Sequence, residues 1–384
     1  MKQKIVIIGA NSFQNRLILR AKELGYETHV FAWKCGDIGE RTADYYYPLD
    51  ITKKEEILEV CREIRPAAVL SIASDLAVLT VNYVARNLNL PANPEICDLI
   101  ATNKYEMRKA LQEGGLSTPK FAKVKADENK LPEELKYPVI VKPTDRSGSR
   151  GITKVSQREG IEKALISATR ESFEKAAIVE EFLEGKEYSC ECISFEGKHQ
   201  FLAFTEKFTT GAPHYIEIGH IQPADIPENM QEKIKQIVFA ALEALKIQNG
   251  ATHTEFKIDK QGVVRIIEIG ARMGGDCIGS DLVQLSTGQD YMKMVIDVAQ
   301  GNVPVFQKKT YKKYAAIRFI MQQSDLEIFE KIKERKEFSV VLSEIDKETI
   351  GKKVSDSSSR HGYFIVAGEN YKELKKALFG VIHE

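Results

Sequence analysis

Two glutamates and an arginine fall within one short segment, residues 253–275 (HTEFKIDKQGVVRIIEIGARMGG). The segment is typical of two strands around the turn signal DKQG. With an even number of residues in the loop, Glu255 pairs across from Ile266, and Glu268 lies diagonally next to it on the same face. An odd loop would place the two carboxylates on opposite faces. Two acids on one face, with Arg272 four residues beyond the second, suit a magnesium–phosphate site, although a solvated sheet face carries such acids too.

A lysine followed by a loop of small residues occupies residues 137–155 (YPVIVKPTDRSGSRGITKV). An apolar strand ends at Lys142, and the loop after it contains Ser147, Gly148, Ser149 and Gly151. Small residues let backbone N–H groups approach an anion closely, and a lysine reaches the same anion as a point charge. The segment is not a GxxxxGK[ST] loop, because the lysine precedes the glycines and no helix follows directly. An ordinary hairpin loop is the alternative interpretation.

A third segment, residues 178–193 (IVEEFLEGKEYSCECI), ends an apolar strand in paired acids and an aromatic residue. Such a strand end can offer backbone groups to a purine edge and a carboxylate to ribose hydroxyls. Taken alone, it reads more simply as an acidic connector exposed between strands.

Three residues further along the chain are candidates for the substrate side. Glu217 lies in a stretch that joins two strands and could hold a substrate ammonium, and His220 could orient or deprotonate an amine. Asp276 follows Arg272 in a glycine loop and could line the substrate pocket. A strand-edge acid, a satisfied histidine and a turn aspartate are the structural alternatives.

Other residues of reactive type are given supporting roles. His253 is expected to support the acids rather than to act in catalysis. Lys154 and Lys207 are expected to be solvated. Cys190 and Cys192 are two apart in a strand-like run, so they should face one side of a sheet.

The elements that position these groups begin with an α/β unit. A continuous apolar run at residues 5–8 ends at Gly9 and is followed by alternating helical and strand patterns, which predicts a small doubly wound sheet. Ser74 and Asp75 come at the end of one of its strands and could border a cleft. A dinucleotide site is excluded, because the second and third glycines of GxGxxG are missing and the next strand ends in FAW without an acid.

The rest of the chain divides by its patterns into further units. Linking helices, a strand-rich lid, a core with a long amphipathic helix at 230–245 and a closing helix at 371–379 follow in turn. The predicted domains are 1–94 (α/β), 95–115 (linking helices), 116–184 (lid), 185–304 (core) and 305–384 (a C-terminal α+β subdomain).

The composition sets outer limits on function. The 384 residues are 43% hydrophobic and 29% charged, and Lys plus Arg equal Asp plus Glu at 55 each. This zero balance removes the long-range attraction that draws proteins to nucleic acids or anionic membranes. No apolar run reaches the ~20 residues of a membrane span, and the first residues run straight into a strand pattern without a signal-peptide core. We therefore expect a cytoplasmic protein.

Several of these features, in their order along the chain, resemble the ATP-grasp superfamily. They are Lys104, Lys142, the Ser/Gly loop, the EEF segment (Glu180, Glu181 and Phe182) and the two acids with their arginine. The resemblance is to its carboxylate–amine ligase branch, with L-amino acid ligase-like and biotin carboxylase-like members. It runs from the N-terminal unit to Gly288, with a family-like tail. It implies an ATP-grasp fold, α/β and α+β, with an N-terminal doubly wound pre-ATP-grasp domain.

The resemblance also implies a role for each matching residue. Lys104 and Lys142 would bind the α- and β-phosphates, and the loop from Ser147 to Gly151 would close over the triphosphate. The adenine would meet backbone groups of Glu181, Phe182 and Leu183 with Glu180 near its exocyclic amine, and Glu187 would hold the ribose. Glu255 and Glu268 would bind Mg²⁺, or Mn²⁺ in its place, and Arg272 would steady the acyl-phosphate. One departure is Gly270, where the family often has an asparagine ligand.

The implied activity is ATP-dependent ligation: an acyl-phosphate forms from a carboxylate and passes to an amine or thiol, giving ADP and phosphate. The partners are then small-molecule carboxylates and amines, not nucleic acid or membrane. A homodimer remains open, because similar enzymes are often dimers. One alternative is a biotin carboxylase-like or purine-pathway-like enzyme acting on bicarbonate or formate. Another is a non-catalytic ATP-binding module, against which stand the retained Lys142, Glu255, Glu268 and Arg272.

Overall fold

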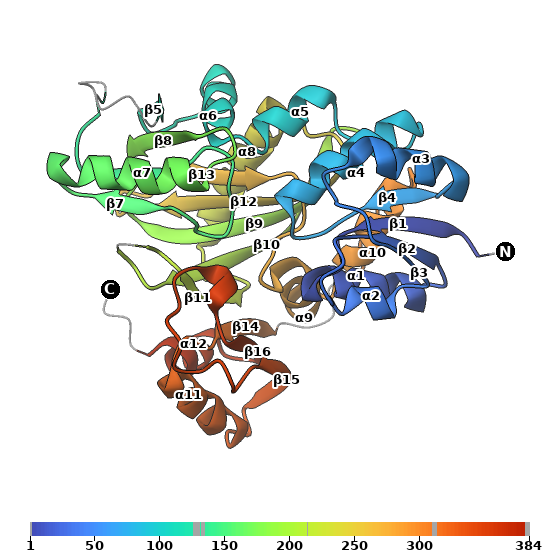
Figure 1. The fold of residues 1–384 in the computed structure, drawn as a ribbon. Helices are drawn as coiled ribbons and strands as arrows, with labels where there is room; N and C mark the ends of the chain where they lie inside the picture. The colour runs from blue at the N-terminus through green and yellow to red at the C-terminus, as the bar shows by residue number, and fades with distance from the viewer. Residues whose placement is uncertain (1, 126–130, 132–134, 213, 309–312, 381–384) are drawn as a thin grey trace.

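The computed structural model describes residues 2–125, 131, 135–212, 214–308 and 313–380, whose strands form three sheets. The first is a parallel four-stranded sheet, seen at the right of Figure 1, in the order β3-β2-β1-β4. Its strands are β1 (Lys4–Ile8), β2 (Glu27–Phe31), β3 (Tyr45–Tyr47) and β4 (Ala68–Leu70). The helices of this region are α1 (Ser12–Glu23), α2 (Gly39–Thr42), α3 (Lys54–Ile64) and α4 (Asp75–Asn87). Four of the five β1 residues are fully buried, as expected of a parallel strand covered on both faces.

The second sheet forms the lid, drawn mainly in green in Figure 1. It is reached through α5 (Glu95–Ile100) and α6 (Lys104–Glu113). Its antiparallel strands, in the order β5-β8-β6-β7, are β5 (Phe121–Lys125), β6 (Val139–Pro143), β7 (Thr153–Val155) and β8 (Ala176–Glu181). A single-turn helix η1 (Arg158–Gly160) leads into α7 (Ile161–Glu171), which packs its buried face on β6.

The third sheet is antiparallel and has eight strands in the order β13-β12-β9-β10-β11-β14-β16-β15. The strands are β9 (Lys186–Phe195), β10 (Lys198–Thr209), β11 (Glu217–Gln222), β12 (Gly250–Ile258), β13 (Val264–Gly270), β14 (Tyr314–Phe319), β15 (Phe338–Ile345) and β16 (Gly362–Gly368). The remaining helices are α8 (Glu228–Ala244), η2 (Ile278–Leu282), α9 (Val283–Thr287), α10 (Tyr291–Ala299), α11 (Gln323–Lys333), η3 (Ser357–Ser359) and α12 (Tyr371–Phe379). Because this sheet continues from the predicted core into the C-terminal subdomain, the boundary at residue 304 stays a proposal.

Several elements agree with the sequence patterns and others were missed. The long amphipathic helix and the closing helix lie within about two residues of their predicted bounds. The tail also holds α11 and β15, which the patterns did not reveal. Cys190 and Cys192 face one side of β9 as predicted, with their sulfurs 3.6 Å apart.

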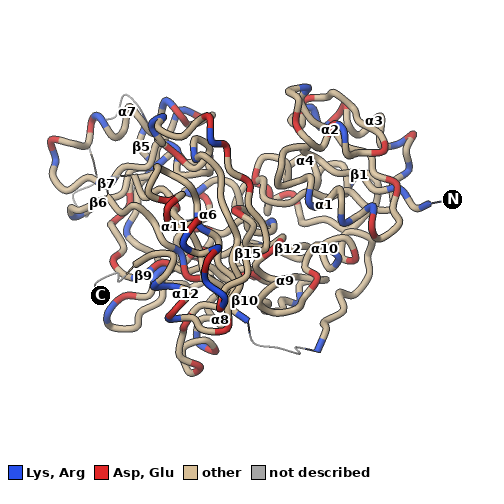
Figure 2. Tube along the Cα trace, turned by 90° about the horizontal axis from the view of Figure 1, so that it is seen from below, with Lys and Arg blue, Asp and Glu red and all other residues tan. Residues whose placement is uncertain are grey.

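Basic and acidic residues are mixed along the chain. Figure 2 shows basic and acidic residues interspersed along the trace, in keeping with their equal totals. Within the described ranges, no helix combines the length and the apolar composition needed to cross a bilayer.

Candidate functional site

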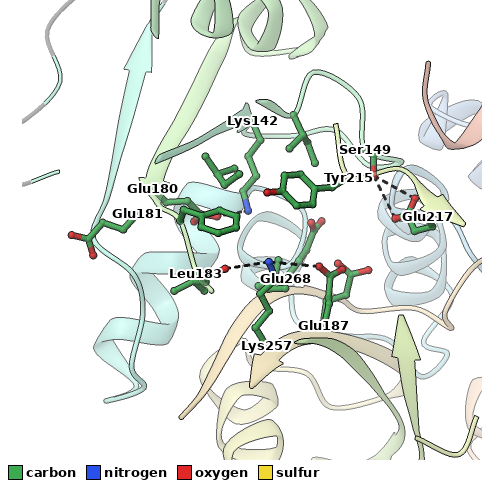
Figure 3. Close-up of a pocket in the computed structure, with 15 residues that line it drawn as sticks. Lys142, Ser149, Glu180, Glu181, Leu183, Glu187, Tyr215, Glu217, Lys257 and Glu268 are labelled. Carbon is green, nitrogen blue, oxygen red and sulfur yellow. Dashed lines mark hydrogen bonds and ion pairs between the residues drawn. The ribbon is translucent and has the colours of Figure 1, made fainter. Parts of the chain in front are cut away.

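A narrow opening, which we call the slot, lies between the lid sheet and the β9, β12 and β13 strands (Figure 3). It collects most of the residues predicted to bind nucleotide or metal: Lys142, Ser149, Glu180, Glu181, Phe182, Leu183, Glu187, Glu255 and Glu268. The sequence did not single out five further lining residues: Ile140, Ile152, Tyr215, Lys257 and Ile267.

A buried trio of charges lies at the lid side of the slot. The Lys142 ammonium lies 2.5 Å from Oε1 of Glu180, and Nε of Arg108 donates to Oε2 at 2.9 Å. Arg108 also donates to the carbonyl of Ile267 on β13, which ties α6 to the eight-stranded sheet. Burial would raise the pKa of Glu180, but the two cations lower it to about 2. The predicted contact of Glu180 with the adenine amine stays a prediction, since both of its oxygens are paired with cations here.

Phe182 follows β8, and two lysine ammonium groups lie near its ring. The Lys154 ammonium is 3.7 Å and the Lys257 ammonium 4.9 Å from the ring centroid. The Lys257 ammonium also donates to the carbonyl of Leu183 at 3.1 Å. An oxygen of Glu187 lies 4.0 Å from the same ammonium. Lys154, which was expected to be solvated, is half-buried and has the Phe182 ring beside its ammonium. Burial raises the pKa of Glu187.

Glu255 and Glu268 share one face of the β12–β13 hairpin, but not by the predicted register. The loop contains five residues, 259–263, so it is odd, and Phe256 pairs with Ile266. A register shift beside Phe256 then brings Glu255 directly opposite Glu268. The diagonal arrangement was wrong, and the bulge restores the shared face that an odd loop alone would have removed.

Each of these carboxylates has a lysine partner. The Lys207 ammonium donates to Glu255, and the Lys104 ammonium donates to Glu268 at 2.8 Å. Lys104 also donates to the backbone carbonyl of Arg146. The expectation that Lys207 is solvated is wrong: its side chain is 3% exposed, because β10 lies in the middle of a sheet whose polar face is covered.

Arg272 forms a bidentate ion pair with Asp75 at the start of α4, with donor–acceptor distances of 2.9 and 3.1 Å. Gly270 packs closely against this pair. A Cβ at position 270 would lie 3.0 Å from the Arg272 guanidinium and 3.1 Å from Asp75. A side chain at position 270 would therefore require the Arg272–Asp75 pair to shift slightly.

His253 bridges the buried Glu191 and Glu255. Its Nδ1 lies at hydrogen-bond distance from Glu191, and its Nε2 lies 3.2 Å from Oε1 of Glu255. Burial would lower the pKa of His253, but the two carboxylates raise it to about 9. The second oxygen of Glu191 accepts from the backbone of Gly274. These contacts match the supporting role that the sequence suggested for His253.

The second opening, which we call the cleft, has a volume of about 940 Å³ and lies between the N-terminal unit and the lid. Among described residues, Glu268 is the single one that lines both slot and cleft. The loop between β6 and β7, which we call the flap (residues 144–152), separates them. Its Ser149 and Ile152 face the slot, whereas Ser147 and the arginines at 146 and 150 face the cleft. Gly148 and Gly151 have positive φ angles of 74° and 66°.

The three candidate substrate residues do not form one group. Glu217 lines the slot and accepts from Ser357 of the C-terminal subdomain at 2.5 Å and from Ser149 at 3.4 Å. Asp276 instead pairs with Arg360 at 2.6 Å, and Nε2 of His220 lies 3.4 Å from the same carboxylate. Burial lowers the pKa of His220. The sequence missed Ser357 and Arg360, because only the fold brings them against Glu217 and Asp276.

Residues 135–281 match the family model described as an ATP-grasp domain. This segment is an ATP-grasp domain. The chain is 30% identical over 222 residues to alanine–anticapsin ligase of Bacillus subtilis (strain 168), covering 52% of this chain and 46% of that protein. It is 27% identical over 217 residues to D-alanine–D-alanine ligase of Geobacillus thermodenitrificans (strain NG80-2), covering 51% and 57%. The chain thus spans about half the length of these relatives.

Solved structures resemble the chain over nearly its whole length. L-amino acid ligase from Bacillus licheniformis is 26% identical, with 98% of this chain and 96% of that one covered at a TM-score of 0.83. Phosphoribosylglycinamide synthetase from Anaerococcus prevotii is 25% identical, with 100% and 98% covered at a TM-score of 0.77. The resemblance and the fold class expected from the sequence, an ATP-grasp fold with an N-terminal α/β domain, are confirmed.

The acid pair of the ATP-grasp domain fits a magnesium ion that is shared with phosphates. Glu255 and Glu268 supply only oxygen donors, and their side chains are 23% and 27% exposed. In the described part of the chain, no three His, Cys, Asp or Glu side chains gather to hold a metal by themselves. Magnesium is commonly held by one or two carboxylates together with phosphate oxygens and water, so two acids suffice. Once bound there, it would offset charge on the phosphoryl group being transferred.

Proposed function

We propose that this chain is an ATP-dependent ligase that activates a carboxylate as an acyl-phosphate and transfers the acyl group to an amine or thiol. The observation that carries the proposal is the junction at Glu268. Glu268 faces Glu255 across β12 and β13 and lines both the slot and the cleft. This arrangement would bring the γ-phosphate of a nucleoside triphosphate in the slot next to a carboxylate substrate in the cleft.

The proposed chemistry takes place in two steps. A carboxylate oxygen attacks the γ-phosphorus, the new C–O–P linkage forms, and the bond to ADP breaks. The amine nitrogen then attacks the acyl carbon, phosphate departs with the former carboxylate oxygen, and the nitrogen loses a proton. Lys142 and Lys104 would hold phosphate charge, and Arg272 would hold the acyl-phosphate. The flap would exclude water, which would otherwise hydrolyse the intermediate.

The assigned nucleotide and metal roles belong to this proposal. They are supported by the placement of the glutamates, Lys142 and the EEF segment in one slot. We also propose the cytoplasm as the location and small-molecule acids and amines as partners, with a homodimer as an open expectation. A biotin carboxylase-like enzyme acting on bicarbonate is less well supported, because the biotin carboxylase structures that resemble this chain share the fold at 16% identity.

Phosphate release tests the proposal. The protein is incubated with Mg-ATP and with pools of the twenty amino acids, of organic acids, and of bicarbonate. We expect release that requires a particular acid together with a nucleophile pool. Nucleotide binding without stimulated release by any pool would favour a non-catalytic ATP-binding module, and absence of ATP binding would refute the assignment.

A further inference from the structure

The cleft offers three groups that the ATP chemistry leaves unused. We propose, resting on the proposed function, that the activated acid is a bulky apolar amino acid. Its side chain packs on Trp33 and α4, its ammonium group faces Gln14, and its carboxylate faces Arg150 of the flap.

The apolar part of the cleft comes from the N-terminal unit. Trp33 directly follows β2 and lines the cleft while 45% exposed. Its backbone carbonyl accepts from the Tyr46 hydroxyl at 2.9 Å, which fixes the position of the chain there. Leu76 and Leu79 lie three apart in the first turns of α4 and line the same cleft half-buried. An exposed aromatic residue and two leucines that line one cleft offer apolar surface, which an apolar ligand group would cover favourably.

The flap wall carries the positive charge. Arg146 and Arg150 both line the cleft half-buried, and Arg146 stacks at 4.4 Å on the Phe173 ring. Neither guanidinium has a carboxylate partner in the described part of the chain. In contrast, Arg108 and Arg272 in the neighbouring network are each paired with an acid. A half-buried guanidinium without an acid is suited to a ligand carboxylate, which it can hold by two hydrogen bonds.

The opposite wall carries acceptors. The amide nitrogen of Gln14 donates to the Ile72 carbonyl at 2.6 Å, which identifies the other amide atom as the oxygen. That oxygen is buried and has no hydrogen-bond partner among the described residues, although Gln14 lines the cleft. Asp37 lines the same wall. A buried unpaired acceptor costs about 1–3 kcal/mol, so a ligand N–H donor is expected there.

The distribution of these groups selects the ligand class. Acceptors on one wall and guanidiniums on the other match a zwitterion, and the aromatic surface beside the acceptors matches a bulky side chain. The volume of about 940 Å³ far exceeds what bicarbonate or formate needs and leaves room for the attacking amine.

The test uses Trp33, the chain's one tryptophan, as a reporter. Its fluorescence is followed in the full-length protein, with Mg²⁺ and a non-hydrolysable ATP analogue, during titration with phenylalanine or leucine. We expect a saturable change with both. Glycine should bind at least about 10-fold more weakly, because it lacks the side chain. 3-Phenylpropionate and phenethylamine, which each lack one charged group, should also bind at least about 10-fold more weakly.

Two variants locate the binding groups. Arg150→Gln should weaken phenylalanine binding about 10-fold and 3-phenylpropionate binding equally, whereas phenethylamine binding should stay unchanged. Gln14→Leu should show the reverse pattern, with phenethylamine and phenylalanine weakened and 3-phenylpropionate unaffected. Arg158→Gln, an exposed arginine of the same lid, is the matched control and should bind as the parent does.

Several results would overturn the inference. These are tighter binding of glycine or bicarbonate than of phenylalanine, parental affinity in Arg150→Gln, or calorimetric binding of phenylalanine without a change at Trp33. The proposed function is tested separately. Phosphate release that needs only formate or bicarbonate would keep the ligase and refute the amino acid. Binding of phenylalanine without phosphate release from any pool would keep the amino acid site and refute the ligase.

Discussion

The slot and the cleft meet at Glu268 and differ in how their charges are satisfied. In the slot, Lys142 pairs with Glu180 and Lys207 pairs with Glu255, so the charges are neutralised before any ligand enters. In the cleft, Arg150 and the Gln14 oxygen have no protein partner among the described residues. A slot whose polar groups hold one another keeps its shape for a constant ligand, whereas open groups await a ligand that completes them.

The first prediction breaks the slot network. Arg108→Met should lower the free energy of unfolding by about 3–5 kcal/mol, because it removes one of the two cations facing the buried Glu180. Urea denaturation measures the change. The control is Arg62→Met, whose exposed pair with Glu59 should be worth less than about 1 kcal/mol. Equal losses in the two variants would show that the buried network is not structural.

The second prediction breaks the junction between the two openings. Glu268→Ala should slow acid-stimulated phosphate release by about 100–1000-fold, because a carboxylate facing the transferred phosphoryl group is lost. The control is Glu184→Ala, an exposed acid just beyond the EEF segment, which should retain full activity. A Glu268→Ala protein that melts normally and keeps most of its activity would contradict the assignment.

The third prediction sharpens the comparison through pH. The pKa of Glu180 is lowered from 4.5 to about 2, so its contribution to stability is complete above pH 4.5 and is lost as the pH falls towards 2. At pH 3 the loss is about 2 kcal/mol relative to neutral pH. Unfolding curves at pH 6, 4 and 3 check this value. In Arg108→Met the free energy of unfolding should fall less steeply between pH 6 and pH 3. An unchanged pH dependence would argue against the Arg108–Glu180 pair as its cause.

The fourth and smallest prediction concerns the flap, the wall common to both openings. Gly148 and Gly151 both have positive φ, and alanine at either position should cost about 1 kcal/mol for that conformation. Gly151→Ala should cost more, because its Cβ would lie 3.1 Å from Pro143, whereas a Cβ at Gly148 has open space. Thermal melts of the two variants give the order, and the reverse order would contradict this description of the flap.

The sequence predicted the slot better than the cleft for a physical reason. Lys142, the EEF segment and the acid pair lie in short strand-and-loop segments whose local patterns place them. The register of Glu255 and Glu268 was wrong, because the loop has an odd number of residues and a bulge beside Phe256 shifts the pairing, and neither can be read from the strand pattern. Lys207 was misjudged, since a lysine in a strand looks solvated until the acids that the neighbouring strands place beside it are known.

The cleft residues come from separate parts of the chain. Trp33 and Gln14 belong to the N-terminal unit, and Arg150 lies more than a hundred residues later on the flap. No spacing rule joins them, so only the packing of the lid against the N-terminal unit brings them together. The same is true of Arg360, which reaches Asp276 from the C-terminal subdomain.

The central claim, that a carboxylate is activated as an acyl-phosphate, is tested most directly by following oxygen. The acid that stimulates phosphate release is labelled with ¹⁸O in its carboxylate and turned over with ATP and the nucleophile, and the products are analysed by mass spectrometry. The account predicts one labelled oxygen in each phosphate released, with ADP unlabelled. Phosphate without the label, or label in AMP, would contradict it.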